Sequence, residues 1–244
     1  MGHARNHRLR ILAEKSAKAD EFGGNRLDAS FYELQLIELK NDKSLLSKVK
    51  SDKAKALAKA NLIPKYLPYV EGVIAADKKV EDEIVTTIML WCFDAAHFKT
   101  GLNIAEFALK YGLEMPDSFS RDTPSIVAEE IANAALENIK LKKPVDLDVL
   151  LKAHELTKDF DMHDQIQAKL FCAIGRVYNL QENHVLAVHF MKEALSKNPH
   201  VGCKQECDKA EKLITTPSED NKKPENQNGS STDKPSDDQD KKSS

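Results

Sequence analysis

Residues that interrupt regular structure or cross-link small domains are scarce in this chain. Its 244 residues include only 9 glycines, 9 prolines and 4 cysteines. Scarce glycine and proline disfavour a loop-rich fold or a β-sandwich, and so few cysteines exclude a disulfide framework. A chain of this length buries roughly 70 % of its unfolded surface and needs no such cross-links. The cysteine content indicates a reducing, intracellular setting.

Long apolar runs and strand patterns are also missing. No apolar run approaches the roughly 20 residues of a membrane-spanning helix, because Lys, Glu or Asp interrupts each one. The first ten residues lack the apolar core of a secretory signal. Sustained alternation of apolar and polar residues is absent, and no Asn-Gly turn occurs before residue 216. We therefore expect an all-α protein of the cytoplasm with no membrane partner.

Neither sign of charge dominates the whole chain, whose formal net charge is -3, but basic and acidic residues are unevenly distributed along it. Residues 1–65 carry 14 basic and 8 acidic side chains, residues 66–215 carry 17 and 24, and residues 216–244 carry 5 and 7. The three parts therefore have net charges of +6, -7 and -2. Such asymmetry raises the question of a nucleic-acid partner.

The chain accordingly divides into three predicted regions. Residues 1–65 are expected to form a basic, helical DNA-binding region, and residues 66–215 a helical-hairpin body for assembly and partner docking. Residues 216–244 contain no aliphatic or aromatic side chain. They cannot bury enough apolar surface to offset the entropy of ordering, so we predict a disordered tail.

Helical periodicity runs through the chain as far as this tail. Ser30 and Glu33 fit a capping box, with Asp28 as a rival cap. Polar residues 41–44 are expected to break the first of these helices, and the prolines in 64–68 to shape a turn. Further predicted caps are Ser44, Thr123 with Pro124 in the first turn, and Asp146. The predicted helices cover about 31–40, 44–60, 80–98, 125–141, 146–158, 164–178 and 184–197, with a last one ending near 214.

One helical hairpin has the spacing of a tetratricopeptide repeat. Small residues at Gly175 and Ala187 would let its two helices approach closely. The full pattern consists of Phe171, Ile174, Gly175, Tyr178, Ala187, Met191, Ala194 and Pro199. A looser version runs from Trp91 to Pro116. Two such hairpins do not make a solenoid, so the pattern predicts a helical-hairpin array with tetratricopeptide-like hairpins.

Residues for phosphodiester hydrolysis are hard to find. Glu38 and Lys40 have the Glu-x-Lys form of many nucleases, and Asp28 lies ten residues upstream. That pattern normally occurs on paired strands, whereas these residues lie in a helical segment, so they are weak catalytic candidates. Mg²⁺ would be needed only if this chain itself cleaves DNA. The acidic run 81–83 is better explained as negative charge at a helix N-terminus.

Other catalytic or metal-binding patterns are incomplete. His200, Cys203 and Cys207 have zinc-ligand chemistry, but a fourth ligand at a convincing spacing is missing, so no metal site is predicted. Cys92 and Cys172 fall on apolar helical faces and are expected in the core. The chain has neither a phosphate-binding Gly-x-x-x-x-Gly-Lys-Ser/Thr loop nor a Gly-x-Ser-x-Gly elbow.

Basic side chains near the N-terminus carry the clearest functional signal. Arrays of this kind neutralise backbone phosphates and gain from counterion release. The competing explanation is an ordinary solvated helix face, because acidic residues are interspersed. Lys48, Lys55 and Lys59 are expected to share one helical stripe. The predicted DNA-binding residues are Arg5, Arg8, Arg10, Lys15, Lys18, Lys48, Lys55 and Lys59.

Several segments together resemble a known protein family. The most specific is Ala-Leu-Lys-Tyr-Gly-Leu-x-Met-Pro at 108–116. Others include Leu-Pro-Tyr-Val-Glu-Gly-Val at 67–73, Met-Leu-Trp at 89–91, and Thr-Pro at 123–124 followed by Glu129 and Glu130. Over about residues 8–212 the chain resembles the small terminase subunit of cohesive-end tailed bacteriophages, the family called terminase, endonuclease subunit.

This resemblance implies a role in viral genome packaging. Such subunits work with a large ATPase subunit to recognise concatemeric DNA at its packaging (cos) site, cut it and feed it into a prohead. It also implies double-stranded DNA as a partner and assembly into a homo-oligomer. The nuclease site could lie in this chain or in the large subunit. The alternative is a helical adaptor without direct DNA contact.

Overall fold

The computed structural model describes residues 2–19, 29–116 and 119–215, and within these ranges it contains ten α-helices and no strand. The all-α prediction is confirmed for this part of the chain. The predicted tail, 216–244, lies outside the described residues. The helices are α1 His3–Ala19, α2 Ala29–Ser47, α3 Asp52–Ala76, α4 Glu83–Asp94, α5 Phe98–Tyr111, α6 Thr123–Lys140, α7 Leu147–Thr157, α8 Asp164–Leu180, α9 His184–Lys197 and α10 Lys204–Thr215.

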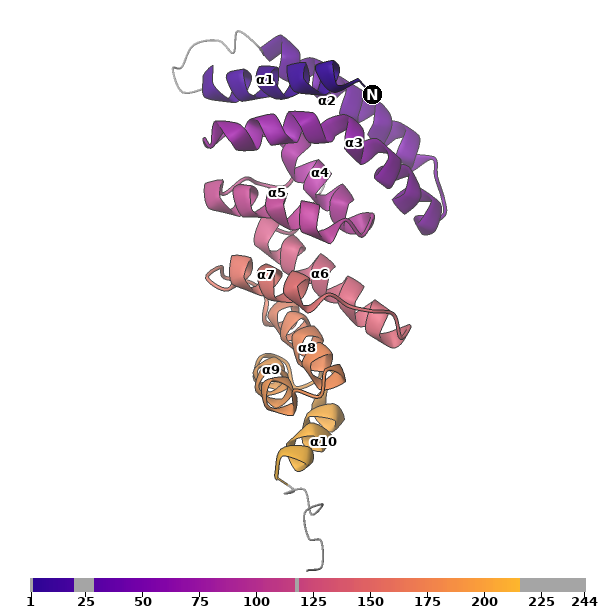
Figure 1. The fold of residues 1–244 in the computed structure, drawn as a ribbon, viewed down its shortest axis with the longest axis vertical. Coiled ribbons are helices and arrows are strands. Elements are labelled where there is room, and N and C mark those ends of the chain that lie inside the picture. The colour runs from indigo at the N-terminus through magenta and orange to yellow at the C-terminus, as the bar shows by residue number, and fades with distance from the viewer. Residues whose placement is uncertain (1, 20–28, 117–118, 216–244) are drawn as a thin grey trace, which may run out of the picture.

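The helices stack in chain order into an elongated array, with α1, α2 and α3 at one end and α10 at the other (Figure 1). Helices that follow one another pack together, as in α3 with α4, α4 with α5, α8 with α9, and α9 with α10. Two further packings, α1 on α3 and α6 on α8, join these neighbours. One apolar core runs from α1 to α8, and a smaller one joins α8, α9 and α10.

The hairpin of α8 and α9 shows the close approach that its small residues predict. A Cβ atom added to Gly175 would lie 2.7 Å from Cγ of Met191 and 3.1 Å from the carbonyl oxygen of Ala187. Real Cβ atoms almost never approach within 3.0 Å, so a larger residue at this position would force Met191 or the α8–α9 packing to shift. The observed bounds differ from the predicted ones by no more than two residues at either helix.

The N-terminal helices differ from the sequence prediction. We expected residues 41–44 to break a helix and Ser44 to cap the next, but α2 continues to Ser47 and Ser51 caps α3. Asp42 explains the difference, because it is buried and its carboxylate accepts a hydrogen bond from the Tyr66 hydroxyl at 2.6 Å. A polar residue that looks like a turn signal is therefore a buried anchor between α2 and α3.

The predicted turn around the prolines of 64–68 is also wrong, because Pro64 and Pro68 lie inside α3. A proline removes one backbone hydrogen bond and bends a helix, and Figure 1 shows α3 bending along its length. Buried tyrosines hold the bent segment in place. Tyr66 bonds to Asp42, and the Tyr69 hydroxyl donates to Asp82 at 2.6 Å.

Helix ends in the middle of the chain needed smaller corrections. The segment 80–98 was predicted as one helix, but α4 covers only Glu83–Asp94 of it and α5 begins at its last residue, Phe98. Asp122, rather than Thr123, caps α6 by accepting a hydrogen bond from the Ser125 amide at 3.1 Å. The Thr123 hydroxyl instead donates to the carbonyl oxygen of Leu113 at 2.5 Å.

Two predictions about helix starts are confirmed. Asp146 caps α7 by accepting a hydrogen bond from the Asp148 amide at 3.1 Å. In the acidic run 81–83, Asp82 caps α4 by accepting from the Ile84 amide at 2.9 Å. Negative charge at these positions complements the helix dipole and satisfies free backbone amides.

Candidate nucleic-acid interface and central pocket

Helix α1 presents a cationic outer surface. Its inner side buries Ala13, Ser16 and Ala17 against the array. Residues three and four apart share a helix face. The positions opposite and beside the buried ones carry exposed basic side chains. These exposed residues are Arg5, Arg8, Arg10, Lys15 and Lys18, which are all the DNA-binding candidates predicted for this helix.

Most of these cations form no ion pair with another described residue. Lys18 pairs with Glu14 at 2.5 Å. In the described part of the chain, Arg5, Arg8, Arg10 and Lys15 form no ion pair. Arg5 also lies in the first turn, where the partial positive charge of the helix N-terminus disfavours a cation. This placement does not stabilise the helix, and it leaves positive charge available to an external anion.

The position of α1 depends on Gly72 in α3. A Cβ atom at this position would overlap the carbonyl oxygen of Arg10 and lie 2.8 Å from Cβ of Ala13. The obstructing oxygen belongs to the backbone and cannot rotate away. Gly72 therefore allows α1 to lie directly on α3, which holds the cationic surface against the array.

The second group of predicted cations is divided by the fold. Lys48 lies between α2 and α3, while Lys55 and Lys59 lie on α3, so the single helical stripe that we expected does not exist. Lys48 and Lys55 form no ion pair among the described residues. Lys59 is mostly buried and pairs with Asp94 of α4. The free charge of this group therefore lies near the connection between α2 and α3.

The nuclease candidates do not converge. Glu38 pairs with Lys65 at 2.9 Å, whereas Lys40 is exposed and lies two positions away on the same helix. Residues two apart on a helix point in different directions. Asp28 lies outside the described residues. Among the described residues, no group of three or more His, Cys, Asp or Glu side chains could hold a metal ion.

The four cysteines are free and buried. Burial raises the pKa of the Cys92 thiol to about 12. Cys172, Cys203 and Cys207 lie in the small core that joins α8, α9 and α10, whereas His200 is exposed. The cysteines therefore act as apolar packing residues in this fold.

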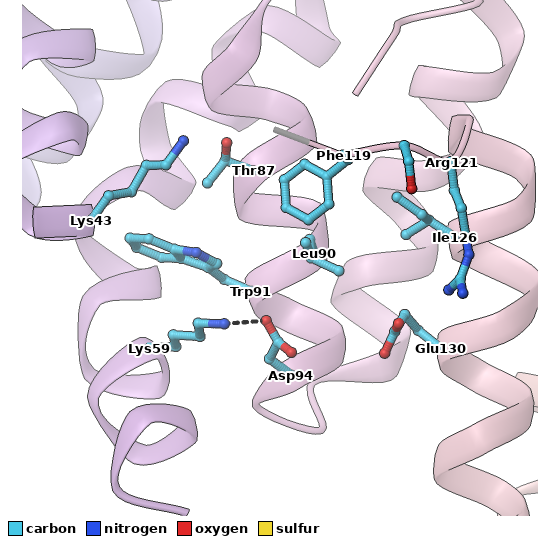
Figure 2. Close-up of a pocket in the computed structure, with 11 residues that line it drawn as sticks. Lys43, Lys59, Thr87, Leu90, Trp91, Asp94, Phe119, Arg121, Ile126 and Glu130 are labelled. Carbon is cyan, nitrogen blue, oxygen red and sulfur yellow. Dashed lines mark hydrogen bonds and ion pairs between the residues drawn. The ribbon is translucent and has the colours of Figure 1, made fainter. Parts of the chain in front are cut away.

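A pocket of about 390 Å³ opens where α2, α3, α4 and the start of α6 meet (Figure 2). Aromatic and aliphatic side chains form part of its wall, and basic and acidic side chains form the rest. We call it the central pocket. It is lined by Lys43, Lys59, Thr87, Leu90, Trp91, Asp94, Phe119, Ser120, Arg121, Ile126 and Glu130.

Every basic side chain of the central pocket has an acidic partner. Lys43 pairs with Glu83 at 3.0 Å, and Lys59 pairs with Asp94. The third, Arg121, pairs with Glu129, which is one position before the pocket residue Glu130. The positive charge in the pocket is therefore already neutralised by the chain itself.

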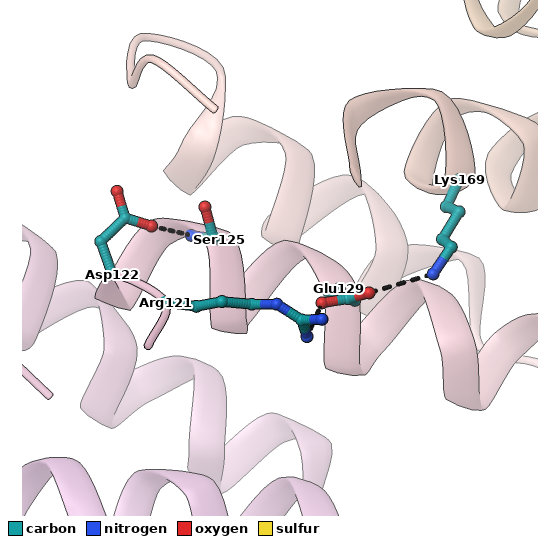
Figure 3. Close-up of polar contacts among 5 residues, drawn as sticks. All are labelled: Arg121, Asp122, Ser125, Glu129 and Lys169. Carbon is teal, nitrogen blue, oxygen red and sulfur yellow. Dashed lines mark hydrogen bonds and ion pairs between the residues drawn. The ribbon is translucent and has the colours of Figure 1, made fainter. Parts of the chain in front are cut away.

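The acidic pair at 129 and 130 is held in two different ways. Glu129 is buried and lies between Arg121 and Lys169, the second at 3.0 Å (Figure 3). Glu130 forms no hydrogen bond or ion pair with any described residue. Burial and the nearby charges of Asp94 and Glu129 raise the pKa of Glu130 above its ordinary value. Glu130 is thus an acidic group of a partly apolar pocket that has no partner in the part of the chain that the structure describes.

Comparison with known proteins identifies the family of the chain. The family of phage small terminase subunits matches residues 36–165, about half of the chain. The chain belongs to this family. The protein named "Terminase, endonuclease subunit" of Escherichia phage P2 is 32 % identical over 211 residues, covering 86 % of this chain and 85 % of that protein. The "Probable terminase, endonuclease subunit" of Haemophilus phage HP1 is 23 % identical over 155 residues.

No solved structure matches the chain. The family resemblance inferred from the sequence is confirmed. The matched stretch of this small terminase subunit contains every residue of the central pocket, whereas α1 precedes it. None of its described helices is long and apolar enough to span a membrane.

Sequence reasoning missed the central pocket. Its residues come from four helices and from the segment before α6, so no local pattern announces it. Two signals were present. Trp91 is the chain's only tryptophan, and Glu129 and Glu130 belong to a segment that carries the family resemblance.

Proposed function

We propose that this small terminase subunit is the DNA-recognition subunit of a phage packaging nuclease. It would bind concatemeric viral DNA at the packaging (cos) site and support cutting and packaging by a large ATPase subunit in the host cytoplasm. The observation that carries the proposal is the row of unpaired cations on α1. Four of them face outward without an acidic partner among the described residues, as a phosphate-binding surface requires.

The proposal keeps the division into a basic head, 1–65, an acidic body, 66–215, and a tail. Because α3 crosses the boundary between head and body, the two regions would move as one unit. The body, with its tetratricopeptide-like hairpin, would serve assembly into a homo-oligomer and docking of the large subunit. Many of its charges are satisfied internally, as shown by Arg176 with Glu206 at 2.7 Å and Lys152 with Glu106 at 2.9 Å.

A nuclease site within this chain is the less favoured reading. The relatives from phages P2 and HP1 are named endonuclease subunits. Among the described residues, Glu38 and Lys40 belong to no group of three or more side chains that could hold a metal ion. The proposal therefore assigns strand cleavage to the complex, with the large subunit supplying the catalytic centre.

The proposal is tested by measuring the affinity of the purified full chain for a cos-containing duplex. The test variant carries Arg5→Glu, Arg8→Glu and Arg10→Glu together. Its matched control carries three Lys→Glu changes at the end of α6 and just after it, at exposed positions that form no ion pair with any described residue, namely Lys140, Lys142 and Lys143. We expect the α1 variant to lose affinity strongly and the control to lose little.

Equal losses in the two variants would show that net charge, rather than α1, governs binding. Unchanged binding by the α1 variant would contradict the α1 interface and direct attention to the connection between α2 and α3. No DNA binding by the unmodified chain at low salt would favour the adaptor alternative.

A further inference from the structure

The central pocket has features of a binding site that the DNA-binding proposal does not use. It contains none of the α1 cations, and its volume of about 390 Å³ accommodates a large side chain. Phe119 is an exposed aromatic residue of its wall, Trp91 is a buried one, and Glu130 lies on the side opposite Trp91 (Figure 2). Aromatic faces and a carboxylate together are the groups that recognise an organic cation.

The charges in the pocket favour a cation over a phosphate. Each lining cation is already neutralised, by Glu83, Asp94 or Glu129. A phosphate would have to break one of these ion pairs and would also approach Glu130. A cation would instead meet Glu130, the pocket carboxyl group that has no partner among the described residues.

Glu130 also carries an electrostatic cost that a bound cation would relieve. It is partly buried, and Asp94 and Glu129 place two further negative charges near it. Arg121 and Lys59 oppose this effect only from a distance, because each pairs directly with another acid. A cation in the pocket would stabilise the charged form of Glu130 through a hydrogen-bonded ion pair.

We propose that the central pocket binds an arginine side chain that projects from a partner protein. The guanidinium group would pair with Glu130, and its flat face would pack against the exposed ring of Phe119, above the buried Trp91. Arginine suits the site better than lysine, because the planar guanidinium can stack on a ring and bond to a carboxylate at the same time. This proposal does not depend on DNA binding by α1.

The single tryptophan makes occupancy of the pocket directly measurable. Trp91 is the only tryptophan of the chain, so its emission reports on this site alone. The probe is the blocked peptide acetyl-Gly-Arg-Gly-amide, titrated into the full chain at low ionic strength. The matched probe replaces arginine with citrulline, which has nearly the same shape and no charge. We expect a saturable change in emission with the arginine peptide only.

Variants at two positions of α6 complete the experiment. Glu130→Gln removes the charge and keeps the shape, and we expect it to weaken binding of the arginine peptide roughly tenfold or more. Glu137→Gln changes an exposed glutamate of the same helix and should leave the affinity unchanged. Circular dichroism shows whether each variant keeps its helical content.

Four results would overturn the proposal. The first is the absence of a saturable change in emission with the arginine peptide, and the second is an equal change with the citrulline peptide. The third is full affinity of Glu130→Gln for the arginine peptide. The fourth is a change in emission with duplex DNA but not with the arginine peptide. A change in emission with protein concentration that disappears after charge reversal of α1 would assign the pocket to a second copy of the chain instead.

Discussion

Replacing Gly72 with alanine should destabilise the protein, although the same change stabilises most helices. At an open helical position, Gly→Ala raises the free energy of unfolding by roughly 0.4–1 kcal/mol. At Gly72 the new Cβ would overlap the carbonyl oxygen of Arg10 and lie 2.8 Å from Cβ of Ala13. Carbon atoms pack best at about 3.5–4.0 Å, so α1 would have to retreat by about 1 Å.

That retreat sets the size of the effect. Overpacking of a close helix contact costs about 1–3 kcal/mol, and α1 would also lose part of the burial of Ala13 and Ala17. We therefore expect Gly72→Ala to lower the free energy of unfolding by about 1–2 kcal/mol, measured by urea denaturation followed by circular dichroism. Glu71→Ala, at the exposed neighbouring position, is the control and should change stability by less than about 0.5 kcal/mol.

Hydrogen exchange locates the effect within the fold. The amides of α1 should exchange faster in Gly72→Ala, because this helix must move away from α3, while those of α8 keep their protection. A variant as stable as the unmodified chain, with α1 equally protected, would refute the assignment of Gly72 as the contact that holds α1 in place.

Three further predictions concern the acidic residues. Glu129→Ala should lower the free energy of unfolding by about 2 kcal/mol in urea denaturation, because Arg121 and Lys169 lose their buried partner. The loss is moderate because both cations are exposed enough to regain water. An unchanged free energy of unfolding would contradict a structural role for this carboxylate. The folded state raises the pKa of Glu130, so its ionisation destabilises the fold as the pH rises above about 4.5. Glu130→Gln should therefore be more stable than the unmodified chain at pH 7, and this advantage should vanish in denaturation curves recorded near pH 3. Clean protein without the large subunit should not cut cos-containing DNA in the presence of Mg²⁺ or Mn²⁺, and site-directed cutting that Glu38→Ala abolishes would place the nuclease in this chain.

Helix positions in the C-terminal half could be predicted closely because local signals and packing agree there. Asp146 is followed by a helical apolar stripe, and Gly175 lies where two helices touch. The N-terminal half contains the opposite situation. Asp42 and Pro64 are ordinary turn signals, but a buried hydrogen bond to Tyr66 overrides the first and packing of α3 tolerates the second.

The candidate sites also divide into features that local sequence predicts and features that depend on tertiary packing. Exposure of Arg5, Arg8 and Arg10 could be expected, because a cluster of cations on one short helix has few ways to be buried. The pairing of Lys59 with Asp94 could not, since the two residues are 35 positions apart and meet only through the packing of α3 on α4. The isolation of Glu130 likewise depends on which neighbours its helix places around it.

The salt dependence of DNA binding tests the central claim, recognition of DNA by α1, most directly. For duplex DNA, the logarithm of the affinity falls with the logarithm of salt concentration by about 0.9 for each phosphate contact. If Arg5, Arg8 and Arg10 each contact a phosphate, reversing all three charges should make the slope shallower by about 3. A slope identical to that of the unmodified chain would contradict recognition of DNA by α1.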